Sequence, residues 1–140
     1  MALRLMRNPV GRFFIKRIWS RNMARKTLED LVFDKSSITD EEIDRMWDLS
    51  TYPGNMDAMF REFAENWEDF NQTEIGGITT NTLLIWGEED SICPKSMGSW
   101  YDSQLPNSTM VVLPEIAHNP HFECPNRCLD EISSWMGTLS

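Results

Sequence analysis

The chain has 140 residues, of which 41% are hydrophobic and 25% are charged, and this balance is typical of one modest globular domain with its own core. No apolar run approaches the roughly 20 residues that a membrane-spanning helix needs, and no segment resembles a secretory signal peptide. The formal net charge of −9 argues against a nucleic-acid partner. We therefore expect neither a membrane nor a nucleic acid among its partners.

The first 26 residues differ sharply in charge from the rest, because they hold eight of the thirteen basic residues and no acidic one. Val10, Phe13, Phe14 and Ile18 recur there at helical spacing. Such a segment is typical of a mitochondrial presequence or of a basic amphipathic helix on an acidic body. Serine is scarce in it and the helical pattern continues beyond it, so we favour the second interpretation. We expect a cytoplasmic location, with the mitochondrion as the alternative, and the three cysteines favour a reducing compartment.

The residues around position 39 predict the N-terminus of a helix. Thr39 and Glu42 have the spacing of a capping box, in which each side chain bonds the other residue's backbone N–H. Ile38 and Ile43 flank the box as a hydrophobic staple. The pattern predicts a helix from this point, with Trp47 on its apolar face.

A second apolar stripe at helical spacing follows the break at Pro53-Gly54 and predicts another helix. Gly76-Gly77 then indicates a junction, and we predict two segments, 1–75 and 76–140. The stripe consists of Met56, Met59, Phe60, Phe63 and Trp67.

The second half changes from helical to strand patterns. Residues 82–86 and 109–113 are short, apolar and rich in β-branched side chains, which is typical of strands buried on both faces. A helical stretch, around residues 95–103, lies between them, so the order predicts a parallel βαβ unit. Pro125 predicts the start of a terminal helix.

An acid and a histidine follow the two predicted strands. Asp90 comes after the first strand, and His118 comes after the second. Because the carboxyl ends of parallel strands meet at one edge of a sheet, we expect the two side chains to lie close together. A carboxylate bonded to one imidazole nitrogen fixes the tautomer and leaves the other nitrogen free as a base.

These motifs carry a resemblance to a known family. Residues 84–94, Leu-Ile-Trp-Gly-Glu-Glu-Asp-Ser-Ile-Cys-Pro, resemble a strand and acid turn of the α/β-hydrolases, and residues 117–125 resemble their histidine loop, Gly-His-x-x-x-x-Glu-x-Pro, with Ala117 in place of glycine. The helical first half is similar to the cap of dehalogenase, epoxide-hydrolase and ester-hydrolase relatives. The resemblance implies an α/β fold class: the C-terminal part of an α/β-hydrolase fold, with a helical cap-like segment (1–75) before a βαβ unit and a terminal helix (76–140).

The resemblance also implies roles. His118 would be the general base and Asp90 the acid that orients it, acting on a small-molecule ester, epoxide or haloalkane without a cofactor. A substrate pocket under the cap would be lined by Trp47, Trp67, Phe60 and Phe63. Plain helix packing is the alternative explanation for each of these four apolar side chains.

The family's nucleophile is missing from the printed sequence, which contains no Gly-x-Ser-x-Gly turn. The nearest pattern, residues 94–98, lacks the first glycine and follows the acid strand. Cys93 is a candidate nucleophile, but no adjacent base would lower its pKa, and a small buried hydrophobe is the better interpretation. We therefore expect a truncated or split hydrolase that associates with itself or with an N-terminal partner fragment. The alternative is a non-catalytic remnant that serves as an interaction or ligand-binding module.

A zinc site is a further alternative for the histidine loop. His118, His121, Cys124 and Cys128 are zinc-type ligands within eleven residues. However, Pro125 and the predicted terminal helix constrain the last two, and closed sites usually draw ligand pairs from separate elements. We therefore assign no metal from the sequence.

Overall fold

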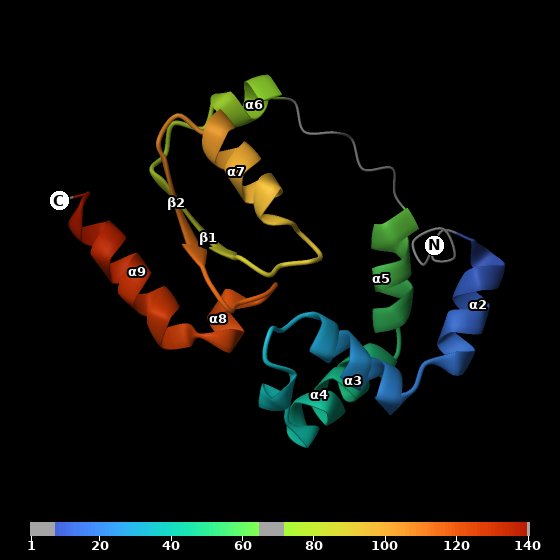
Figure 1. The fold of residues 1–140 in the computed structure, drawn as a ribbon. Helices are drawn as coiled ribbons and strands as arrows, with labels where there is room; N and C mark the ends of the chain where they lie inside the picture. Colours follow the sequence, from blue (N-terminus) through green and yellow to red (C-terminus); the bar gives the residue numbers. More distant parts are fainter. Residues whose placement is uncertain (1–7, 65–71, 140) are drawn as a thin grey trace. The chain divides into compact units, whose positions relative to one another are not determined.

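The computed structural model describes residues 8–64 and 72–139, and the chain divides into two compact units (Figure 1). The helical unit comprises residues 1–28 and 38–68, and the sheet unit comprises residues 29–37 and 69–140. Residues 29–37, called the strap below, therefore group with the sheet unit although helices of the other unit flank them in sequence. The division predicted at residues 75 and 76 stays a prediction.

Two helices of the helical unit begin at capping residues that the sequence contains. Asn8 accepts a hydrogen bond from the Val10 N–H at the first helix, with proline at its start. The predicted capping box is confirmed, because the Thr39 hydroxyl accepts from the Glu42 N–H and the Glu42 carboxylate accepts from the Thr39 N–H. Its helices are α2 (Pro9–Ile18), α3 (Arg21–Asp30, whose last two residues belong to the strap), α4 (Asp40–Thr51) and α5 (Asn55–Ala64).

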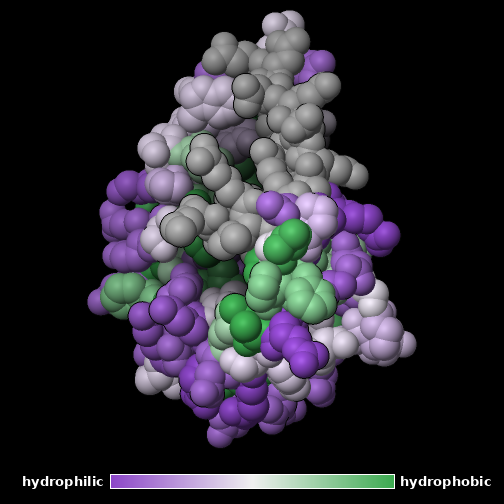
Figure 2. Space-filling view, turned by 90° about the vertical axis from the view of Figure 1, so that its right-hand side faces the viewer, coloured by the Kyte–Doolittle hydropathy of each residue, from purple (hydrophilic) through white to green (hydrophobic). Residues whose placement is uncertain are grey.

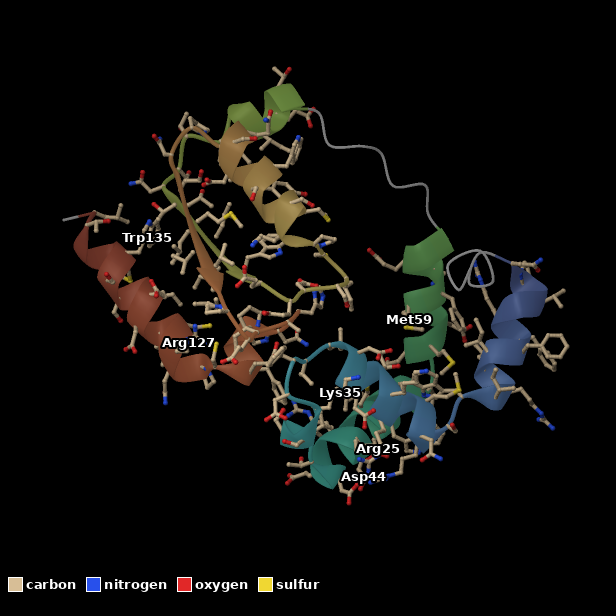
Figure 3. All side chains as sticks on the ribbon, in the orientation of Figure 1. Arg25, Lys35, Asp44, Met59, Arg127 and Trp135 are labelled. Carbon is tan, nitrogen blue, oxygen red and sulfur yellow. The ribbon has the colours of Figure 1, made fainter. Side chains whose placement is uncertain are left out.

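Ion pairs join the basic segment to the acidic helix α4. Arg25 lies 2.7 Å from the Asp40 carboxylate, and Arg21 bonds both Asp40 and Asp44. Figure 3 shows Arg25 and Asp44 on the neighbouring helices α3 and α4. Part of the basic segment therefore lies on an acidic helix, as the amphipathic-helix interpretation expects.

A patch of apolar side chains remains exposed on α2. Val10, Phe13, Phe14 and Ile18 are each between 59% and 65% exposed. Figure 2 faces the side that carries α2 and shows hydrophobic side chains gathered among hydrophilic ones. None of the helices in residues 8–64 and 72–139 combines the length and the apolarity that a bilayer crossing requires.

The sheet unit contains the predicted βαβ arrangement. β1 and β2 pair in parallel, in register from Thr82 opposite Ser108 to Gly87 opposite Leu113. Figure 1 shows α7 and α9 on opposite sides of this pair. The terminal helix begins at Pro125, as predicted. The elements are a 3₁₀ helix (Lys35–Ser37), α6 (Gln72–Gly76), β1 (Thr82–Gly87), α7 (Lys95–Gln104), β2 (Ser108–Leu113), α8 (Pro120–Glu123) and α9 (Pro125–Gly137).

The strands are less buried than their sequences predict. Residues 82–86 are all partly exposed, whereas strands covered on both faces were expected. The reason is that the sheet of the described residues has two strands, so each strand keeps one edge without a neighbour. The buried core lies between the end of β2 and α9 and consists of Leu113, Ile116 and Cys128, against which Ile85, Val111 and Cys124 pack.

The end of β1 passes very close to the loop that follows β2. A Cβ atom added at Gly87 would lie 2.0 Å from the Ala117 carbonyl oxygen and 2.4 Å from that of Ile116. Two hydrogen bonds hold the backbones together, from the Glu88 N–H to the Leu113 carbonyl and from the Glu89 N–H to the Ile116 carbonyl, both 3.0 Å. Only glycine fits this position.

We expect Gly87→Ala to lower the free energy of unfolding by about 3 kcal/mol or more, because rigid backbone oxygens occupy the space of the added methyl group. Urea unfolding followed by circular dichroism measures the change. Gly137→Ala is the matched control, since a Cβ there meets no atom within 4 Å, and it should leave stability unchanged or slightly higher. Equal stabilities of the two variants would contradict this account of Gly87.

Candidate active site

The loop after β1, residues 88–94, is called the acid loop because it is built around Asp90. One carboxylate oxygen, Oδ1, accepts hydrogen bonds from the N–H groups of Ile92 (2.9 Å) and Cys93 (2.8 Å). The indole N–H of Trp86 donates to the Cys93 carbonyl at 2.8 Å, which holds the loop against its own strand. The Asp90 side chain is 6% exposed, so these local bonds fix a nearly buried carboxylate.

The loop after β2, residues 114–119, is the histidine loop. Glu115 adopts a φ of 60°, the left-handed region that non-glycine residues rarely occupy, and the chain turns there. Beyond the turn, the Ala117 N–H donates to Glu123 Oε1 at 2.9 Å, and the His118 N–H donates to the Leu31 carbonyl at 3.1 Å. Backbone bonds on two consecutive residues therefore fix the position from which the imidazole extends.

The structure brings Asp90 and His118 together. Asp90 Oδ2 lies 2.9 Å from His118 Nδ1, and the histidine side chain is 31% exposed. An ionised carboxylate can only accept, so Nδ1 carries the proton and donates. In the neutral imidazole, Nε2 is then left with a free lone pair that can take a proton.

The electrostatics of Asp90 favour the ionised form. Burial raises the pKa of Asp90, but hydrogen bonds from the Cys93 N–H, from His118 and from the Ile92 N–H outweigh it, and the pKa lies below its ordinary value. The carboxylate is therefore charged at neutral pH, as an acceptor for Nδ1–H must be.

Cys93 is the residue whose position the sequence reasoning missed. Its thiol, a carboxylate oxygen of Asp90 and a ring nitrogen of His118 lie within 4.8 Å of one another. Burial and the charge of Asp90 raise the pKa of Cys93, so the thiol is protonated and poorly suited to nucleophilic attack. The residues next to Cys93 in the sequence do not reveal that it lies near His118, because His118 belongs to a loop 25 positions further along the chain.

The two cysteines of the zinc group considered from sequence make other contacts. Cys128 is buried in the core, and Cys124 Sγ donates to the Pro120 carbonyl at 3.3 Å. Neither these two nor His121 belongs to the cluster of Asp90, Cys93 and His118, which is the one such group within the described residues. The zinc group considered from sequence is therefore not assembled there.

Glu123 joins the histidine loop to the strap. Besides holding the Ala117 N–H, its second oxygen, Oε2, accepts from the Phe33 N–H at 2.6 Å. The strap in turn offers the Leu31 carbonyl to His118. The glutamate is visible in the sequence motif, but its partner in the strap lies 90 positions away and gives no sequence signal.

A hollow of about 430 Å³ lies between the strap and the acid loop. It reaches Ala117, the residue before His118, and its walls carry carboxylates as well as apolar groups. The lining residues are Glu29, Asp30, Val32, Phe33, Lys35, Glu89, Ser91, Ile92 and Ala117.

Two of the four aromatic residues predicted to line a pocket can be placed, and both lie in the helical unit. Trp47 is half-buried on α4, and Phe60 is fully buried on α5. The Phe63 side chain and Trp67 lie outside the described residues. The role of all four in a substrate pocket stays a prediction.

A parallel βαβ unit with an acid and a histidine beyond its strand ends is the arrangement that the α/β-hydrolase resemblance implies. A sequence profile of the family described as "alpha/beta hydrolase fold" matches residues 2–125. The chain therefore belongs to the α/β-hydrolase family.

Individual proteins agree with this assignment. An uncharacterized hydrolase of Bacillus subtilis, YugF, is 30% identical over 128 residues, covering 91% of this chain and 47% of that protein. A 2-hydroxy-6-oxononadienedioate/2-hydroxy-6-oxononatrienedioate hydrolase of Cupriavidus pinatubonensis is 26% identical over 71% of this chain and 35% of its own length. The solved structure of a thermophilic esterase from Thermogutta terrifontis has the same fold (TM-score 0.72, 22% identity, 98% of this chain and 50% of that one). The chain thus spans about half the length of these proteins, or less.

We expect Asp90→Asn to remove part of the acid sensitivity of the fold. Because the folded pKa of Asp90 is lowered, its contribution to stability is complete above the unfolded value of about 3.9 and is lost as pH falls toward the folded value. The wild-type free energy of unfolding should therefore fall more steeply than that of the variant as pH drops below about 5. Asp130→Asn, an exposed acid on α9, is the control and should follow the wild-type profile; identical slopes for all three proteins would contradict the prediction.

Loss of the Glu123 carboxylate should destabilise the sheet unit. Glu123→Ala leaves the N–H groups of Ala117 and Phe33 without their acceptors, at about 1–3 kcal/mol for each group that water does not reach. Glu123→Gln keeps one acceptor oxygen and should fall between wild type and alanine in urea unfolding. Glu88→Ala removes an exposed ion pair to Lys95 instead and should cost well under about 1 kcal/mol. A Glu123→Ala effect as small as that of Glu88→Ala would argue against the bridge.

Proposed function

We propose that this chain supplies the base and the orienting acid of an α/β-type hydrolase. In this proposal His118 Nε2 takes a proton from the attacking group and returns it to the leaving group, while Asp90 holds the ring and stabilises the imidazolium. The observation that carries the proposal is the 2.9 Å contact between Asp90 Oδ2 and His118 Nδ1, which leaves Nε2 free.

The geometry supports acid–base catalysis more than a purely structural role for the pair. Nε2 of His118 has no hydrogen-bond partner among the described residues, and the side chain is 31% exposed, so a reacting group can reach this nitrogen. The acid is ionised, and both loops are fixed by backbone bonds, so little reorganisation precedes proton transfer.

The nucleophile and the oxyanion donors of this proposal lie outside these 140 residues. We propose that they come from a further polypeptide segment that completes the sheet, on this chain or on a partner. The open strand edges and the exposed apolar face of α2 support such an association. Self-association through the same surfaces is the other form of this proposal, and a cytoplasmic location remains a prediction.

The proposed substrates are small molecules attacked at a carbonyl carbon. The relatives carry the names of an oxo-acid hydrolase and an esterase, which favours esters and ketones over the epoxides and haloalkanes that the resemblance alone also allows. A hydroxyl nucleophile suits this chemistry, because a histidine base activates it directly.

The proposal predicts the protonation state of His118 in the isolated chain. In ¹⁵N-resolved NMR spectra above pH 8, the ring should carry its proton on Nδ1 and leave Nε2 bare, because Asp90 accepts from Nδ1–H. Asp90→Asn should shift the ring toward the other tautomer. A wild-type ring protonated on Nε2, or one that Asp90→Asn leaves unchanged, would contradict the proposal.

Activity is tested in a completed enzyme. The part of the Thermogutta esterase that lies outside the matched region is joined to this chain, and hydrolysis of p-nitrophenyl butyrate is measured. His118→Ala should lower kcat/KM by about 10⁴-fold or more, because the base then has no substitute. His121→Ala, an exposed histidine on the adjoining helix α8, is the matched control and should retain activity. Equal activity of the two variants would favour a non-catalytic binding module.

A further inference from the structure

The cluster of Asp90, Cys93 and His118 combines three metal-binding groups of different chemistry in one small space. Its carboxylate oxygen, thiol sulfur and ring nitrogen lie within 4.8 Å of one another. We propose that these three residues form a binding site for a thiophilic divalent cation of the zinc type. A bound cation would prevent His118 from acting as a base.

The ligand set selects the kind of cation. Thiolate, imidazole and carboxylate together favour zinc over magnesium or calcium, which prefer oxygen ligands. Around a tetrahedral zinc ion the ligand atoms stand about 3.3–3.6 Å apart. The three ligand atoms lie within 4.8 Å of one another and Asp90 Oδ2 is 2.9 Å from His118 Nδ1, so the proposed site requires side-chain rotations that separate this pair and bring the thiol to the ion.

The groups that would support the ligands are already in place. Asp90 Oδ1 accepts two backbone N–H bonds, which leaves Oδ2 free to bind a cation. The Cys93 carbonyl is held by the Trp86 indole, and the His118 N–H is held by the Leu31 carbonyl. Such outer partners fix the directions of metal ligands and strengthen binding.

Charge and burial also fit a divalent ion. One carboxylate, one thiolate and one neutral imidazole balance two positive charges, so the nearly buried site becomes neutral on binding. The Cys93 thiol would release its proton to solvent as the metal binds, and the ring proton of His118 would move from Nδ1 to Nε2, so the imidazole stays neutral. With His118 partly exposed, the fourth position is open to water.

This inference goes beyond the proposed function and does not rest on it, because the cluster exists whether or not the chain is catalytic. If the chain is catalytic, the metal-bound form of His118 and its catalytic form exclude each other. Coordination through Nδ1 removes the proton that Asp90 accepts and holds the ring on the metal, so Asp90 cannot orient a metal-bound His118 as a base.

Titration calorimetry of the purified, chelator-treated chain tests the proposal with zinc chloride, and magnesium chloride serves as the hard-cation comparison. We expect one equivalent of zinc to bind at least 100-fold more tightly than magnesium. Cobalt(II) should give an intense near-ultraviolet band from thiolate-to-metal charge transfer. Cys93→Ser should remove the band and weaken zinc binding by about 100-fold or more, since loss of an outer partner alone costs about 10–100-fold.

Two variants of nearby ligands are the matched controls. Cys124→Ser and His121→Ala change the same residue types outside the cluster and should keep both the band and the affinity. Thermal melting by circular dichroism checks each fold, and Cys93→Val replaces Cys93→Ser if the serine variant does not melt cooperatively. The proposal is overturned if zinc binds no more tightly than magnesium, if the band survives without Cys93, or if Cys124→Ser or His121→Ala abolishes it.

Discussion

The contact between Gly87 and the carbonyl oxygens of Ile116 and Ala117 is the constraint on which the rest of the site depends. The absence of a side chain lets the end of β1 lie directly against the loop after β2. The hydrogen bonds from Glu88 and Glu89 then follow from that proximity. A parallel pair alone aligns strand ends only approximately, and here the glycine reduces the distance until an acid three residues beyond one strand reaches a histidine five residues beyond the other.

Nearby hydrogen-bond donors stabilise the charge of the nearly buried Asp90 carboxylate. Asp90 receives two N–H donors from its own loop and a third from His118, and these three donors stabilise the ionised carboxylate. The histidine is held separately, through the Leu31 carbonyl and through Glu123 on the preceding residue. Asp90 and His118 therefore meet as two fixed groups, which is the arrangement that the proposed proton transfer needs.

Features encoded by near neighbours were predictable from the sequence, and features encoded by distant ones were not. The capping box at Thr39 and Glu42 acts over three residues, and the helix start at Pro125 depends on one. The parallel unit and the pairing of Asp90 with His118 followed from the order of apolar runs and the motif at each end. The bridge from Glu123 to Phe33 spans 90 positions, and the approach of Cys93 to His118 joins two loops, so neither leaves a local pattern. The partial exposure of the strands depends on how many neighbouring strands the sheet has. The sequence of a single strand does not reveal that number.

The strap also gives the histidine loop a mechanical connection. At one end it continues from α3 and at the other it leads into α4, while its middle is bonded to His118 and Glu123. Within the sheet unit, the histidine loop therefore cannot shift unless the bond from the His118 N–H to the Leu31 carbonyl breaks or the strap moves with it.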